Sequence, residues 1–178
     1  MRLLAVPQKR VGAFKKKNNA LLREIESRCG VKLSFKDDGS LQIDAADEES
    51  NGVGDGSGSE WIAEQVCHAI ALGFDSRRAF KLLDDNCFLE EIDLAQSVHG
   101  SAKALHRYKA RIIGEQGKIK RNIEEYSGAL LAIGDERVAF LGGFKEIKLA
   151  KDAVFKILEG KEISTVYAFL EKYSKKTL

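Results

Sequence analysis

The sequence predicts an α+β protein made of two domains that share one fold. The main observation is an internal repeat: residues 23–33 align with residues 121–131 at an offset of 98, and Arg, Ile, Glu, Gly and Leu recur in place. After residue 60 the offset becomes 87, so the first copy carries an insertion of 11 residues. A repeat copied once indicates two domains, because a solenoid needs three or more units.

The elements of the second copy follow from apolar spacing and from turn residues. Residues 88–94 form a predicted edge strand, 102–113 a helix and 114–117 a tight turn. In the next helix, 118–126, Ile119, Ile123 and Tyr126 share one face, and Gly128 is the predicted stop. The remaining prediction is strands at 129–133 and 137–141, a helix at 145–158, and an additional C-terminal helix at 164–173 capped by Ser164. The order is β-α-α-β-β-α plus one helix.

The first copy repeats this order. Its predicted elements are residues 3–6, 9–14, 18–28, 31–35, 41–43 and 60–72. The insertion, placed at about residues 45–59, is acidic and rich in glycine and has little to bury. We therefore predict domains at 1–86, with the insertion, and at 87–178.

Charge is strongly segregated, although the net charge is only +2. Between Arg2 and Lys32 nine bases face two acids, and between Lys103 and Arg121 seven bases face Glu115 alone. The segment between Asp37 and Glu60 carries eight acids and no base. Two basic segments separated by acidic material indicate two sites for a polyanion, with solvated helix faces as the alternative.

Several classes of function find no support in the sequence. No apolar run reaches 18 residues and the N-terminus lacks a signal-peptide core, so we expect a cytoplasmic protein without membrane contact. Cys29, Cys67 and Cys87 lack the spacing of a zinc site. The three histidines form no visible triad, so we expect no enzyme, no metal and no cofactor.

The most informative motif is the turn Gly114-Glu115-Gln116-Gly117, which lies between two predicted helices and is followed by Lys118. Glycine permits the required backbone angles and leaves main-chain N–H groups open to a phosphate. The positive end of the following helix adds attraction for phosphates. A nucleotide-binding phosphate loop is excluded, because Ile112 and Ile119 stand where that motif needs Gly and Ser or Thr.

This β-α-GxxG-α-β-β-α unit resembles the type I KH domain, a module that binds single-stranded nucleic acid. The resemblance implies two tandem KH domains, each with a three-stranded sheet packed by helices. In the second domain it predicts cationic and loop contacts to RNA, above an aliphatic groove for the bases. The predicted contacts are Lys109, Arg111, Ile112, Ile113, Gly114, Glu115, Gln116, Gly117, Lys118, Lys120, Arg121 and Ile133.

In the first copy the corresponding turn is Lys16-Lys17-Asn18-Asn19, and both glycines are missing. Asparagine tolerates left-handed angles, so a turn remains feasible, but side chains occupy the space that a phosphate would enter. We therefore expect a degenerate KH domain that supports RNA binding electrostatically or contacts a protein. Lys15, Lys16 and Lys17 are the candidates for secondary RNA contacts.

The whole chain resembles the archaeal two-KH relatives of the eukaryotic "partner of Nob" small-subunit assembly factor, most specifically over residues 92–171. The resemblance implies an RNA-binding protein that acts in ribosome assembly, at single-stranded RNA near the 3′ end of small-subunit ribosomal RNA. It implies two partners, a Nob-type endonuclease and the alpha subunit of initiation factor two. The alternative function is a protein–protein adaptor, or a translation-linked KH protein that contacts an initiation factor.

Overall fold

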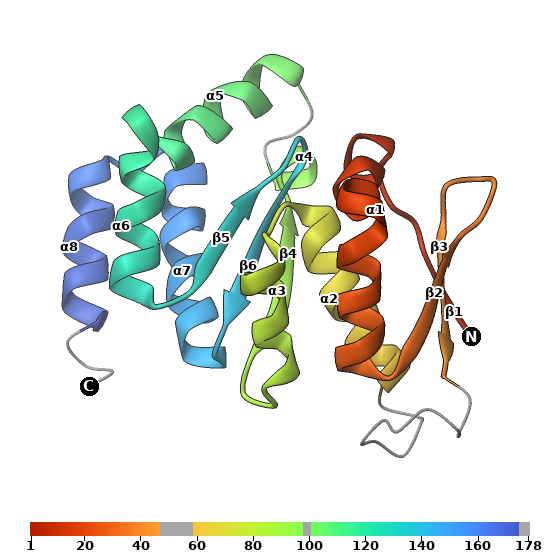
Figure 1. The fold of residues 1–178 in the computed structure, drawn as a ribbon. Helices are drawn as coiled ribbons and strands as arrows, with labels where there is room; N and C mark the ends of the chain where they lie inside the picture. Colours follow the sequence, from red (N-terminus) through yellow and green to blue (C-terminus); the bar gives the residue numbers. More distant parts are fainter. Residues whose placement is uncertain (47–58, 98–100, 175–178) are drawn as a thin grey trace. The chain divides into compact units, whose positions relative to one another are not determined.

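A computed structural model describes residues 1–46, 59–97 and 101–174 (Figure 1). The chain divides into two compact units, Met1–Leu83 and Asp84–Leu178. Each unit contains one three-stranded antiparallel sheet packed by helices. The predicted fold class, an α+β protein with two sheets of three strands, is confirmed.

The first unit has a sheet in the order β1-β3-β2, so β3 is central. Its strands are β1 (Arg2–Leu4), β2 (Val31–Phe35) and β3 (Leu41–Ala45). Its helices are α1 (Gln8–Cys29), α2 (Ser59–Leu72), α3 (Ser76–Ala79) and the 3-10 helix η1 (Phe80–Leu83). Most of the predicted insertion lies outside the described residues.

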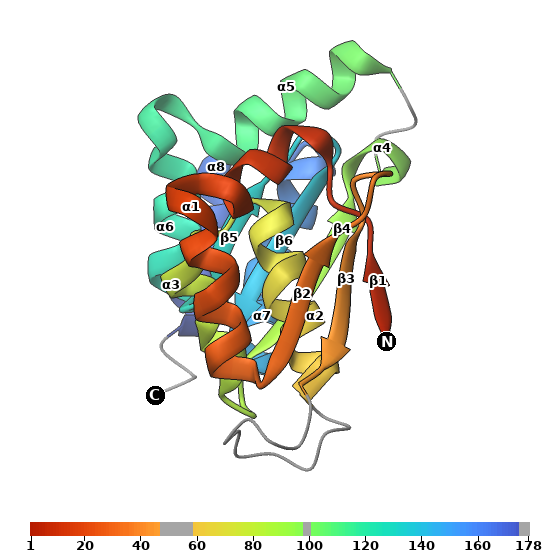
Figure 2. The same ribbon diagram turned by 45° about the vertical axis from the view of Figure 1, so that its right-hand side comes forward.

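The helix α1 corrects one prediction, since the expected helices 9–14 and 18–28 form one continuous helix. A trace of the turn persists at Asn19, which has a φ of 61°. Asn19 corresponds to Gly117 in the repeat, and α1 changes direction near its middle (Figure 2). Asparagine is among the few residues with a side chain that tolerate this backbone conformation.

The second unit has a sheet in the order β4-β6-β5. Its strands are β4 (Phe88–Asp93), β5 (Leu130–Ile133) and β6 (Arg137–Gly142). Its helices are α4 (Leu94–Ser97), α5 (Ala102–Ile113), the 3-10 turn η2 (Glu115–Gly117), α6 (Lys118–Ser127), α7 (Phe144–Leu158) and α8 (Ile163–Ser174). The predicted edge strand, the helix 102–113 and the Gly128 stop are confirmed.

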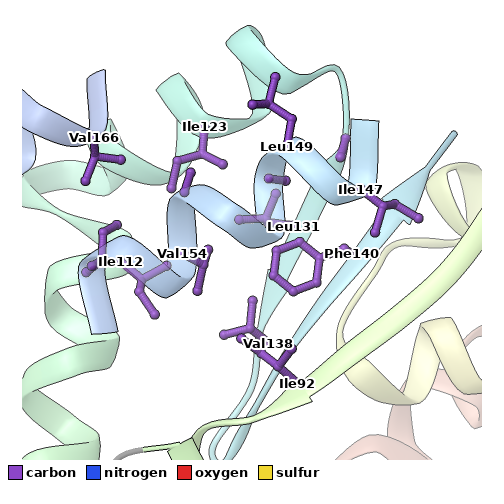
Figure 3. Packing of buried hydrophobic residues seen from close by; sticks show 14 of the residues in the cluster. Ile92, Ile112, Ile123, Leu131, Val138, Phe140, Ile147, Leu149, Val154 and Val166 are labelled. Carbon is purple, nitrogen blue, oxygen red and sulfur yellow. The ribbon is translucent and has the colours of Figure 1, made fainter. Parts of the chain in front are cut away.

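The core of the second unit lies between its sheet and its helices. Figure 3 shows Phe140 and Val138 of β6 pointing toward Val154 and Ile147 of α7, and all four side chains are buried. Ile123 of α6 is also fully buried, as its position in the predicted apolar face requires. This packing fixes α6, and with it the loop that precedes α6.

The start of α8 corrects a smaller prediction. The helix begins at Ile163, where the Glu162 carbonyl accepts from Val166 N–H, so Ser164 lies inside the helix and does not cap it. The Ser164 hydroxyl lies 3.4 Å from a Glu162 carboxylate oxygen instead. Helix α8 also contacts α6: the hydroxyl of Tyr126 on α6 donates to Glu171 on α8 at 3.4 Å, and this carboxylate raises the pKa of Tyr126.

The two units repeat one contact between a helix and a strand. Glu124 Oε1 accepts from the backbone N–H of Leu131 at 2.7 Å, and Glu26 Oε1 accepts from that of Leu33 at 2.8 Å. Both pairs are related by the offset of 98 found in the sequence. The equivalent positions of the repeat therefore occupy equivalent positions in the two structures.

Candidate nucleic-acid interface

The turn between α5 and α6 consists largely of residues with positive φ. Helix α5 ends at Gly114, whose N–H donates to the Ala110 carbonyl at 2.8 Å and whose φ is 72°. Gln116 follows with φ 50° and Gly117 with φ 74°, and α6 starts at Lys118. Because a side chain disfavours positive φ, having glycine at two of the four positions lowers the strain of this turn.

The two glycines meet different surroundings. A Cβ added to Gly114 would lie 2.6 Å from Cγ1 of Ile119, whereas a Cβ added to Gly117 would meet nothing within 4 Å. Gly114 therefore allows Ile119 of α6 to lie close to the backbone of residue 114, and Gly117 leaves its own backbone open. Sequence reasoning missed Ile119 as the reason for Gly114, since the contact arises only when the turn closes.

The N-terminal end of α6 lies beside an open hollow of about 280 Å³ lined by Glu115, Gln116, Lys118 and Arg121. No side chain caps this helix, and its first turn carries no acid. The Arg121 guanidinium donates to the Gln116 carbonyl at 3.3 Å, which keeps its charge beside the loop. A helix N-terminus with two cations attracts an anion such as a phosphate.

Three other predicted cations have partners within the second unit. Lys109 lies 3.6 Å from Asp135, and Lys120 lies 3.8 Å from Glu124. Arg111 donates to two main-chain carbonyls, those of Ile157 and Lys161. Lys118 and Arg121 are thus the predicted cations that line the hollow, while Arg111 is directed to the end of α7.

The three isoleucines of the predicted groove differ in exposure. Ile112 is fully buried in the core, so its side chain offers no surface to a base, contrary to the expectation. Ile113 remains 36% exposed, and Ile133 at the end of β5 is half-buried. An ion pair between Lys109, one turn before Ile113, and Asp135, two residues after Ile133, joins α5 to the turn after β5.

In the first unit, the Lys15 ammonium lies 5.1 Å from the centroid of the Phe35 ring. The backbones of Lys16 and Lys17 continue α1, and their side chains fall outside the described part of the structure. Across the described residues, no group of three or more His, Cys, Asp or Glu side chains could hold a metal ion. None of the described helices is long and apolar enough to cross a membrane.

Comparison with known proteins supplies the class. A family model described as a eukaryotic-type KH-domain (KH-domain type I), for the second domain of PNO1, matches residues 88–175. A KH domain-containing protein of Methanocaldococcus jannaschii is 33% identical over 98% of this chain and 74% of its own length. The fold and the GxxG turn thus define a KH-domain protein of type I.

Solved structures narrow the family. Dim2p from Pyrococcus horikoshii has a TM-score of 0.85 and 31% identity, and the match covers 96% of this chain and 98% of Dim2p. A complex of a/eIF2alpha, aDim2p and rRNA from the same organism gives a TM-score of 0.88 at 31% identity, over 98% of this chain and 94% of the matched one. The chain belongs to the archaeal Dim2p family, which is homologous to the eukaryotic pre-rRNA-processing protein PNO1.

The similarity to eukaryotic proteins is partial. Pre-rRNA-processing protein PNO1 of Gibberella zeae is 34% identical over 117 residues, which are 64% of this chain and 45% of that protein. The chain therefore spans less than half the length of this relative. These relatives carry the names of RNA-binding and pre-rRNA-processing proteins.

Proposed function

We propose that the second unit binds the backbone of single-stranded RNA at Gly114-Glu115-Gln116-Gly117. The observation that carries this proposal is the open hollow at the N-terminus of α6, where Lys118 and Arg121 line a loop without a side chain at Gly117. A phosphate fits such a site because main-chain N–H groups, the helix end and two cations all favour an anion. Ile113 and Ile133 supply the apolar surface for bases.

The target we propose is the 3′ region of small-subunit ribosomal RNA, bound during ribosome assembly and pre-rRNA processing. The name of the Pyrococcus horikoshii complex, which contains rRNA, supports a ribosomal target. The family resemblance further suggests a Nob-type endonuclease as a neighbour on that RNA. In this proposal the chain positions RNA and does not cleave it.

A second candidate function is a protein contact made by the first unit, which we propose to be a degenerate KH domain. Lys16 and Asn19 stand where the second unit has Gly114 and Gly117, so its turn lacks the bare backbone that a phosphate approaches. The presence of a/eIF2alpha in the complex of the relative favours an initiation factor as the partner. An adaptor of this kind would need no RNA at the second loop.

The experiment that separates the two functions changes the charge of the loop. In the variant Glu115→Asp with Gln116→Asp, a second carboxylate faces the phosphate, and Asp still tolerates the positive φ of residue 116. We expect at least tenfold weaker binding of a single-stranded RNA taken from the 3′ end of small-subunit rRNA, since roughly 1.4 kcal/mol of repulsion amounts to tenfold.

The matched control is Glu115→Asp with Gln116→Asn, which has nearly the same size and lacks the added charge. Fluorescence anisotropy gives both affinities, and thermal unfolding checks that both variants fold. If the two variants bind RNA as tightly as the parent protein, the loop does not grip phosphate and the adaptor function is favoured.

A further inference from the structure

Arg111 is three residues before Gly114 and makes two hydrogen bonds with distant parts of the second unit. One Nη atom donates to the Ile157 carbonyl at 3.2 Å and the other to the Lys161 carbonyl at 2.7 Å. Ile157 belongs to the last turn of α7, and Lys161 lies in the connection from α7 to α8. The guanidinium therefore joins the last turn of α5 to the α7–α8 connection.

We propose that Arg111 is a positioning residue, which holds the RNA-binding loop in its conformation by tying α5 to the α7–α8 connection. The planar guanidinium presents two parallel donors, which fixes direction as well as distance. Its charge also lies at the C-terminal end of α7, where carbonyl dipoles favour a cation. Because Arg111 is one turn before Gly114, this contact sets where α5 ends and where the loop begins.

The first unit provides an internal comparison. Ala13 stands at the position that corresponds to Arg111, and α1 and α2 pack against each other although α1 has no arginine at this position. The first unit also lacks both loop glycines. The fold itself therefore does not require this guanidinium, and the arginine occurs in the copy that kept the GxxG turn.

This inference rests on the proposed RNA-binding function, and the experiment keeps the two apart. The variants are Arg111→Lys, which keeps the charge but loses the two-pronged geometry, and Arg111→Met, which loses both. The first measurement is the affinity for single-stranded RNA at several salt concentrations. We expect both variants to bind about tenfold more weakly, the equivalent of one lost hydrogen bond to a charged group, with the salt slope of the parent protein.

A direct phosphate contact would behave differently. Arg111→Lys would then retain most of the affinity, and Arg111→Met would lower the slope of log K against log salt by about 0.7. That pattern would overturn the inference, and so would unchanged affinity in both variants. Thermal unfolding accompanies these measurements, because a purely structural residue would lower stability and leave the RNA affinity of the folded fraction unchanged.

The second measurement uses the protein without RNA, so it holds even if the RNA proposal fails. Amide hydrogen exchange at residues 114–117, followed by NMR, should accelerate in both variants because the loop loses its anchor. The control is Arg107→Met, which removes an exposed arginine one turn earlier on α5. Loop exchange that is as slow in Arg111→Met as in the control would contradict the positioning role.

Discussion

Gly114 lies so close to Ile119 that the first atom of any side chain at residue 114 would fall 2.6 Å from Ile119 Cγ1. Its φ of 72° disfavours a side chain independently of this contact. Gly117 shares the positive φ but has open space around it. The two glycines of one motif thus have separable physical requirements.

Gly114→Ala should therefore destabilise the protein more than Gly117→Ala. We expect Gly117→Ala to cost about 1–2 kcal/mol from backbone strain alone. The overlap with Ile119 should add about 1–3 kcal/mol in Gly114→Ala. Urea denaturation of both variants measures the difference, and equal losses would show that the contact with Ile119 relaxes without cost.

The cations beside the hollow should determine how steeply RNA binding depends on salt. Replacing Lys118 or Arg121 by alanine should each lower the slope of log K against log salt by about 0.7, the value for one phosphate on a single strand. The control is Lys145→Ala. This exposed lysine lies at the start of α7, roughly 18 Å along the helix from Ile157, whose carbonyl accepts from Arg111 in the last turn before the loop. A slope that falls equally in the control would show that general charge, and not this site, governs binding.

Asn19 should be replaceable by glycine but not by alanine. Its φ of 61° is easy for glycine, so Asn19→Gly should be neutral or stabilising, whereas Asn19→Ala should cost about 1 kcal/mol. The neighbouring Ala20 belongs to the same helix, and Ala20→Gly should cost about 1 kcal/mol. Chemical denaturation reports the sign of each change, and a loss of stability in Asn19→Gly would contradict a persisting turn.

Stability should fall at alkaline pH because of the buried thiol of Cys67. Burial raises the pKa of Cys67 to about 12 from its ordinary value of 9.0. Below about pH 9 the thiol is protonated in both the folded and the unfolded chain, so the stability of the protein is complete there. Between about pH 9 and 12 the unfolded chain releases the proton while the folded protein keeps it, so the free energy of unfolding falls as the pH rises. The loss for this thiol approaches about 1.4 kcal/mol per pH unit.

Denaturant unfolding between pH 7 and pH 10.5 measures this dependence. Cys67→Ala should unfold more easily at pH 7, yet its stability should decline less steeply above pH 9. Cys87→Ala, which changes a half-buried cysteine, is the control. An identical alkaline slope in Cys67→Ala and the parent protein would contradict this assignment.

Much of the second unit could be predicted because local signals agree there. Helix α5 has the predicted bounds, and the spacing of Ile119 and Ile123 with the stop at Gly128 predicted α6 to within one residue. In α1 the prediction of two helices was wrong, because the helix continues on both sides of Asn19 although this residue has a positive φ. Periodicity alone does not distinguish this arrangement from two helices.

The site was harder to predict where tertiary contacts determine which side chains are exposed and which partners they have. Ile112 and Ile113 are adjacent apolar residues, and the packing of α5 determines that only Ile112 enters the core. Arg111 was predicted as an RNA contact because a guanidinium suits phosphates, yet in the structure it donates to two main-chain carbonyls. The two carbonyls that accept from Arg111 are 46 and 50 residues away in the sequence, so no local pattern predicts them.

The repeated hydrogen bond, from Leu33 N–H to Glu26 and from Leu131 N–H to Glu124, has a consequence for association between molecules. Both β2 and β5 lie at the edges of their sheets, where unpaired N–H groups invite a strand from another chain. In each unit a carboxylate of the preceding helix already accepts from one of these donors. The duplicated glutamate thus leaves each edge strand one N–H group fewer for pairing with a strand of another molecule.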